Sequence, residues 1–142
     1  MHLLFQRSRI LLRESGGLYL PARAPVGATE PHGGPLTVGD GSTTLTVLSW
    51  PDDLPPPSGT VFHGLRTALG ILGSREARWA GRARQVLDWR QDHRHCGRCG
   101  GVTELSDRGA ALRCPACGLA QFPRVAPAVI VLVHDGERLL LG

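Results

Sequence analysis

The chain has 142 residues and a mass of 15.2 kDa, a size that suits about one ordinary domain. Hydrophobic residues make up 42% and charged residues 20% of the chain, which excludes an intrinsically disordered protein. The longest apolar run falls well short of the roughly 20 residues of a membrane span, and the N-terminal apolar runs are too short for a secretory signal. We therefore expect a cytoplasmic protein with no membrane segment.

The net charge of +4 at pH 7 comes from arginine, since the chain contains no lysine. The excess lies in residues 75–113, which hold nine arginines against five acidic residues. A solvated helix face is the first interpretation of this excess. A surface that binds nucleic acid or another phosphate-rich ligand is the alternative.

Residues 1–73 show the signals of an N-terminal α+β domain. A short strand is expected at residues 17–21, where a proline closes it, and a half-buried strand at residues 43–48, which are rich in β-branched residues. Residues 31–41 are rich in turn formers, and a helix is expected near residues 65–72.

A connecting helix is predicted over residues 74–94, with Ser74 as its N-cap and Glu76 in the first turn, where the helix dipole favours negative charge. Such a helix is about 30 Å long and can join two bodies. One apolar stripe follows the spacing i, i+4, i+7, i+8, at Trp79, Ala83, Val86 and Leu87.

The most specific signal is a set of four cysteines in two C-x-x-C pairs, Cys96 with Cys99 and Cys114 with Cys117. Two such pairs at this separation predict a tetrahedral zinc site in which each pair forms a tight turn. Four thiolates leave no coordination position for water or substrate, so we interpret the zinc as structural over residues 95–123. A ribbon of this size has little core, and metal binding supplies its folding energy.

The four cysteines have two other interpretations besides a zinc site. Disulfides are disfavoured in a cytoplasmic protein, and a redox C-x-x-C would leave the second pair unexplained. His93 and His95 flank the first pair, but four cysteines complete the shell, so both histidines are expected at the surface. Gly100 and Gly118, which follow the two pairs, are expected to supply the positive φ that such turns need.

The last segment, residues 124–142, is expected to begin a further domain. Residues 125–133 are apolar on both alternating faces, which is typical of a strand in the middle of a sheet. Asp135 and Gly136 predict a hairpin turn, and a return strand is expected at residues 138–142. A central strand needs partners on both sides, so we expect this domain to be incomplete within the chain.

The run HRHCGRCGGVTELSDRGAALRCPACGLAQFPRVAPAVIVLV, residues 93–133, resembles the zinc ribbon and following strand of the NADH pyrophosphatase (NAD⁺ diphosphatase) family of Nudix hydrolases. The specific part is the cysteine spacing followed directly by FPRVAPAVIVLV. The upstream stretch HGLRTALGILG is also similar to this family, as are the N-terminal strands.

The resemblance implies an N-terminal domain, a zinc ribbon and a Nudix catalytic domain. It implies hydrolysis of NADH or NAD⁺ to nicotinamide mononucleotide and AMP, or removal of an NAD cap from RNA, by a homodimer. The family uses Mg²⁺ or Mn²⁺ held by glutamates of the pattern G-x5-E-x7-R-E-x2-E-E-x-G. Residues 1–142 contain no R-E-x2-E-E string, so no catalytic residue is assigned and the chain alone is expected to be inactive.

Two substrate contacts are carried over from the resemblance. Phe122 matches an aromatic position beside the nucleotide, with packing under the ribbon as its other interpretation. Arg66 matches an arginine that meets phosphate or carboxylate groups, with a surface ion pair as its other interpretation. Ala22 and Gly109 fall where some members carry a charged ligand contact, which this sequence lacks.

A second function remains open at this stage. A zinc-ribbon module without catalytic activity could bind nucleic acid through the arginine-rich helix, because each phosphate contact releases counterions. The chain has only seven aromatic residues, few for a protein that stacks bases.

Overall fold

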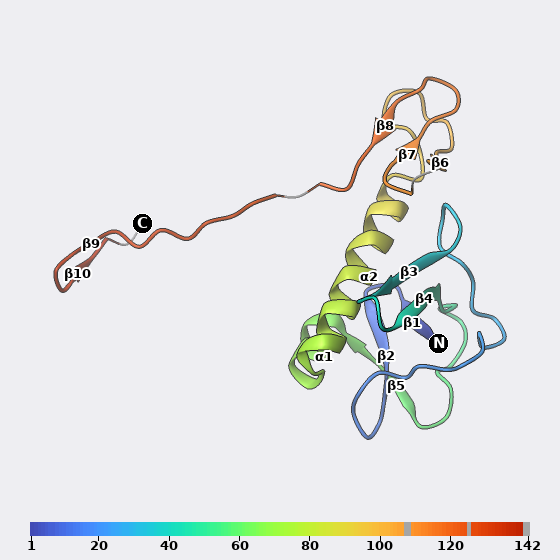
Figure 1. Cartoon of the computed structure of the whole chain (residues 1–142), viewed down its shortest axis with the longest axis horizontal. Helices are drawn as coiled ribbons and strands as arrows, with labels where there is room; N and C mark the ends of the chain where they lie inside the picture. The colour runs from blue at the N-terminus through green and yellow to red at the C-terminus, as the bar shows by residue number, and fades with distance from the viewer. Residues whose placement is uncertain (107–108, 125, 141–142) are drawn as a thin grey trace.

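A computed structural model of the chain describes residues 1–106, 109–124 and 126–140. Figure 1 shows a sheet covered by two helices, the longer of which leads away from the sheet to a small ribbon at its far end. An extended C-terminal segment follows the ribbon. The α+β class expected from the sequence is confirmed.

A five-stranded sheet in the order β3-β4-β1-β2-β5 forms the N-terminal body. The β1–β4 pair is parallel and the other three pairs are antiparallel. The strands are β1 (His2–Gln6), β2 (Arg9–Arg13), β3 (Leu36–Gly39), β4 (Thr44–Ser49) and β5 (Thr60–Gly64).

The sheet is buried on both faces at its centre, in strands β1 and β2. Leu3 and Leu12 pack with the helices, while Leu4 and Leu11 pack on the opposite face against a smaller cluster around Trp50. All four leucines are fully buried. The sequence analysis missed this hairpin because its apolar residues are continuous, as in central strands, and do not alternate with polar ones.

The strand expected at residues 17–21 is wrong. Leu18 makes only one isolated bridge, to Leu12, and the segment otherwise runs as a turn and coil. The strand expected at residues 43–48 is confirmed as β4.

Two helices cover one face of the sheet, α1 (Leu65–Ile71) and α2 (Ser74–Asp92). The apolar stripe of α2 is confirmed, with Trp79, Ala83 and Leu87 buried against the sheet. Ser74 is not the N-cap: Gly73 holds that position and no side chain caps the helix. In the described part of the chain, neither helix combines the length and apolar character needed to cross a membrane.

The ribbon consists of three antiparallel strands of two residues each, β6 (Glu104–Leu105), β7 (Leu112–Arg113) and β8 (Ala120–Gln121). Strands this short offer almost no ladder of hydrogen bonds. The fold of the ribbon therefore depends on its connections to the rest of the chain and on any ion that its turns bind.

The strand expected at residues 125–133 is wrong within the described part of the chain. Residues 126–133 have no regular secondary structure, and Val129 to Val133 are exposed. A strand that is apolar on both faces needs neighbours on both edges, and the described residues provide none. Val125 and residues 141–142, which belong to this segment, lie outside the described residues.

The hairpin expected around Asp135 and Gly136 is confirmed. Strands β9 (His134–Asp135) and β10 (Arg138–Leu139) pair across a turn in which Gly136 has a φ of 58°. This hairpin lies at the end of the extended segment, away from the sheet (Figure 1).

An ion pair between Arg75 and Asp40 ties the start of α2 to the β3–β4 turn. The Arg75 guanidinium donates to Asp40 at 2.6 Å and also to the hydroxyls of Ser42 and Thr43. The hydrogen bonds that the Asp40 carboxylate accepts, first from Arg75 and then from the Ser42 hydroxyl, hold the pKa of Asp40 well below its usual range.

We expect the Asp40→Asn variant to show a flatter dependence of stability on pH in acid. Because the pKa of Asp40 is lower in the folded state, its contribution is complete above the unfolded pKa of about 4 and is lost as pH falls through the folded value. Urea unfolding between about pH 5 and pH 2 measures this difference. The exposed Asp53→Asn variant is the control, and an identical pH dependence in wild type and Asp40→Asn would contradict the assignment.

Candidate metal centre

Two matching turns bring the cysteines together. The Gly100 N–H donates to the carbonyl of Cys96 at 2.9 Å, and the Gly118 N–H donates to the carbonyl of Cys114, also at 2.9 Å. Gly100 and Gly118 have φ values of 75° and 73°, so the expectation of positive φ at both positions is confirmed. The two C-x-x-C segments thus form the same kind of turn, and each turn carries two thiols on the same side.

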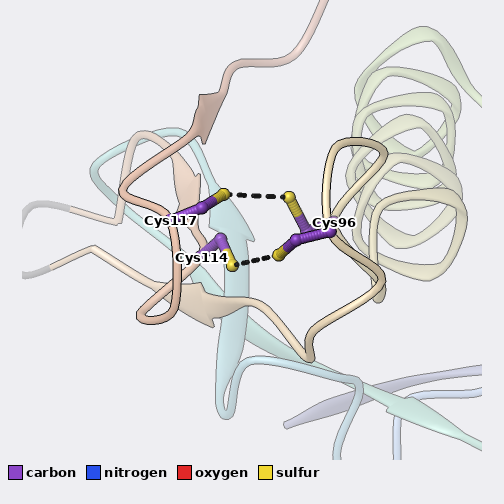
Figure 2. Close-up of side chains that lie close together, drawn as sticks. Cys96, Cys114 and Cys117 are labelled. Carbon is purple, nitrogen blue, oxygen red and sulfur yellow. Dashed lines mark hydrogen bonds between the residues drawn. The ribbon is translucent and has the colours of Figure 1, made fainter.

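The four sulfur atoms lie within 4.8 Å of one another. In Figure 2 the side chains of Cys114 and Cys117 face that of Cys96 across the cluster. The sulfurs of Cys96 and Cys117 are 3.5 Å apart, and those of Cys99 and Cys114 are 3.4 Å apart. Four sulfurs at 2.3 Å from one zinc ion in tetrahedral geometry would be separated by about 3.8 Å. The observed separations fit a single ion of that kind.

The electrostatics of the cluster favour a bound cation. Backbone N–H groups of Arg98 and Cys99 donate to the Cys96 sulfur and lower the pKa of that thiol to about 6. The Gly101 N–H acts in the same sense on Cys99, but the neighbouring sulfurs of Cys114 and Cys117 outweigh it and raise the pKa of Cys99 to about 12. A second thiolate is thus costly beside the first, and a divalent cation removes that cost.

Both histidines next to the first cysteine pair lie outside the cluster. The ring of His93 packs against Trp89, and its Nδ1 lies 2.8 Å from the Trp89 carbonyl oxygen. His95 is exposed and pairs with Val102 through the backbone. Among the described residues, the four cysteines form the only group of three or more His, Cys, Asp or Glu side chains close enough to share an ion.

A pocket of about 500 Å³ lies between the end of α2 and the ribbon. Phe122 and Arg124 line it, together with His95 and Gln121. Phe122 is 62% exposed, so the interpretation that it packs under the ribbon is wrong. Its role as a substrate contact stays a prediction.

Arg66 lies at the other end of the molecule from Phe122. It is an exposed residue of α1, which packs beside the start of α2, whereas the ribbon follows the end of α2 (Figure 1). Helix α2 has 19 residues, a length of about 28 Å. Among the described residues Arg66 has no ion pair, so its other interpretation finds no support.

A set of residues that joins the ribbon to the sheet was not expected from the sequence. Arg90 of α2 is a charged residue, yet only 4% of it is exposed. His32 and Thr103, 71 positions apart in the chain, meet at 3.3 Å. The only sequence signal was the turn-rich character of residues 31–41, which says nothing about what the turn contacts.

Two consecutive parts of the chain each match a domain family of known proteins. Residues 1–89 match the NADH pyrophosphatase-like rudimentary NUDIX domain, and residues 91–122 match the NADH pyrophosphatase zinc ribbon domain.

Three curated relatives illustrate the similarity. The NAD-capped RNA hydrolase NudC of Deinococcus radiodurans is 42% identical over 56% of this chain and 29% of its own length. That of Chromobacterium violaceum is 34% identical over 87% of this chain and 46% of its own. A mitochondrial NAD(P)H pyrophosphatase of Homo sapiens is 38% identical over 57% of this chain and 23% of its own.

The chain therefore spans less than half of the length of these relatives. Within that span, the rudimentary NUDIX domain alone covers more than half of the chain, and the zinc ribbon continues the match through the cysteine cluster. The matches over residues 1–89 and 91–122 place this chain in the NADH pyrophosphatase family.

Proposed function

We propose that the protein containing these residues hydrolyses the pyrophosphate of NADH or NAD⁺, or the NAD cap of RNA. The observation that carries this proposal is the match of two consecutive segments to two domains of NADH pyrophosphatases. The names of the relatives support both substrates, as NAD-capped RNA hydrolases and as an NAD(P)H pyrophosphatase.

The metal of the cysteine cluster is proposed to be zinc in a structural role. Cys96, Cys99, Cys114 and Cys117 would hold it as thiolates, which leaves no open position for a reacting water. The chemistry it supplies is therefore the cross-linking of two turns. No ligand for a catalytic Mg²⁺ or Mn²⁺ is proposed among residues 1–142.

We also propose a four-part organisation, which the two domain matches support. It consists of an N-terminal domain at residues 1–73, a connecting helix at 74–94, the ribbon at 95–123, and the start of the catalytic domain at 124–142. We propose a cytoplasmic location, in which the thiols stay reduced and free to bind metal.

Phe122 and Arg66 are proposed as substrate contacts. Phe122 offers an exposed ring beside Arg124 in the 500 Å³ pocket, where a base could stack near a cation. Because α2 separates Arg66 from Phe122, one dinucleotide could meet both only where a second chain supplies one of them. This separation supports the proposal of a homodimer.

Direct RNA binding by α2 is the second candidate, and the position of two arginines favours it. Arg78 and Arg82 are exposed one helical turn apart, and neither has an ion pair among the described residues. A pair of like charges at this spacing disfavours the helix by a few tenths of a kcal/mol. Phosphates of an RNA chain would relieve that repulsion.

If α2 binds RNA, replacing Arg78 and Arg82 together by alanine should weaken binding and lower the salt slope of log Kd by about 1.4, as expected for two contacts to a single strand. Titration of a labelled single-stranded RNA at several salt concentrations measures both quantities. Arg13→Ala, at the exposed end of β2, is the matched control. Unchanged affinity and slope in the double variant would remove this candidate.

For the metal, Cys117→Ser should abolish stoichiometric zinc binding and unfold residues 95–123, while strands β1 to β5 remain largely folded. Three ligands cannot close the tetrahedron, and the ribbon has no other source of folding energy. Metal analysis together with residue-resolved hydrogen exchange measures this, with His95→Ser as the control. One zinc per chain in Cys117→Ser would show that the four-thiolate assignment is wrong.

The natural full-length protein that contains these residues should convert NADH to nicotinamide mononucleotide and AMP in the presence of Mg²⁺. In that protein, Phe122→Ala should raise KM roughly 5- to 150-fold, the value of one base-stacking contact. Phe122→Tyr should retain the wild-type KM, and Val102→Ala, exposed on the same ribbon, is the control. Intact NADH after incubation with the wild-type protein would refute the proposed function.

A further inference from the structure

The ribbon and the sheet meet at one loop, residues 31–35, with the sequence PHGGP. The loop lies just before β3, on the side of the sheet covered by α2. It makes contacts in two directions, to a buried side chain of α2 and to the interior of the ribbon.

On the α2 side, the loop is held by Arg90. The guanidinium of Arg90 donates to the Gly34 carbonyl at 2.7 Å, and lies 3.4 Å from the His32 carbonyl and 3.5 Å from the Pro35 carbonyl. Its side chain is almost fully buried, and burial lowers the pKa of Arg90. A buried guanidinium is costly unless its N–H groups find acceptors, so loop and arginine hold each other in place.

On the ribbon side, the loop makes a polar and an apolar contact. Thr103, which is 1% exposed, donates its hydroxyl to the His93 carbonyl at 2.7 Å and accepts from Nε2 of His32 at 3.3 Å. Gly33 has a φ of 83°, and a β-carbon there would lie 3.4 Å from Leu105 and 3.7 Å from Leu112. The backbone at Gly33 therefore lies directly against the two leucines that form the ribbon interior.

These leucines connect the loop to the metal centre. Leu112 is fully buried and lies two positions before Cys114, the first cysteine of the second turn. Thr103 lies four positions after Cys99, the second cysteine of the first turn. Any change in the ribbon that moves Leu112 or Thr103 must also disturb residues 32–33.

We propose that this loop couples metal binding in the ribbon to the N-terminal body, with Arg90 as the positioning residue. Metal binding orders the ribbon interior, which holds residues 31–35. Arg90 holds the same residues from the other side, which makes the metal bind more tightly. Such coupling is reciprocal, because a single coupling free energy describes both the effect of the metal on the loop and the effect of the loop on metal affinity.

The coupling extends to a second cavity. Pro31 and His32 form part of the wall of a pocket of about 620 Å³ between the sheet and α2, opposite Arg84 and Asp88. The shape of that wall therefore depends on whether the ribbon holds its metal. The four-cysteine site is thus more than a local cross-link, because it also fixes the interface between two parts of the chain.

Zinc affinity of the whole chain, measured by competition with a chelator, tests the coupling independently of any hydrolytic activity. Arg90→Leu should weaken zinc binding by about 5- to 150-fold, the usual range of coupling between sites. Arg13→Leu, at the exposed end of β2, should leave it within twofold. Equal zinc affinity in wild type and a folded Arg90→Leu would overturn the proposal.

A second measurement needs no variant and covers the case in which Arg90→Leu does not fold. The Gly34 N–H donates to the Pro31 carbonyl at 3.1 Å, so its hydrogen exchange reports on the loop. Zinc addition to the metal-free wild-type chain should slow this exchange at least fivefold and leave the amides of β1 and β2 unchanged. Identical exchange at Gly34 with and without zinc would overturn the coupling.

Discussion

The close approach of four cysteine sulfur atoms is the constraint on which the ribbon depends. The sulfurs lie within 4.8 Å of one another, and their proximity raises the pKa of Cys99 to about 12 while backbone donors lower that of Cys96 to about 6. Without a cation, such a cluster cannot hold several thiolates at neutral pH. With a cation, the same crowding becomes coordination, and three strands of two residues each gain a fixed arrangement.

The N-terminal body has the opposite source of stability. Leucines of β1 and β2 are buried on both faces of its sheet, and Trp79, Ala83 and Leu87 of α2 pack over one of these faces. Helix α2 then leads into the ribbon, and the buried Arg90 ties loop 31–35 between the two parts. A body stabilised by apolar burial and a ribbon that we propose to fold by metal binding therefore share one interface.

The sequence predicted what depends on local pattern and missed what depends on partners. The cysteine turns and the apolar stripe of α2 follow from spacing alone. Arg90 could not be placed, because a helical wheel counts arginine as polar and cannot show the three carbonyls that accept its hydrogen bonds. Residues 126–133 have the composition of a central strand but find no neighbouring strand among the described residues, since composition sets a preference and pairing decides the outcome.

The central claim is that four thiolates, and no histidine, hold one metal ion that gives the ribbon its structure. X-ray absorption spectroscopy of the zinc-loaded chain examines the shell of ligands directly. The account predicts four sulfur neighbours at about 2.3 Å and no nitrogen neighbour. A shell that includes a nitrogen at about 2.0 Å would bring His93 or His95 into the site and contradict the account.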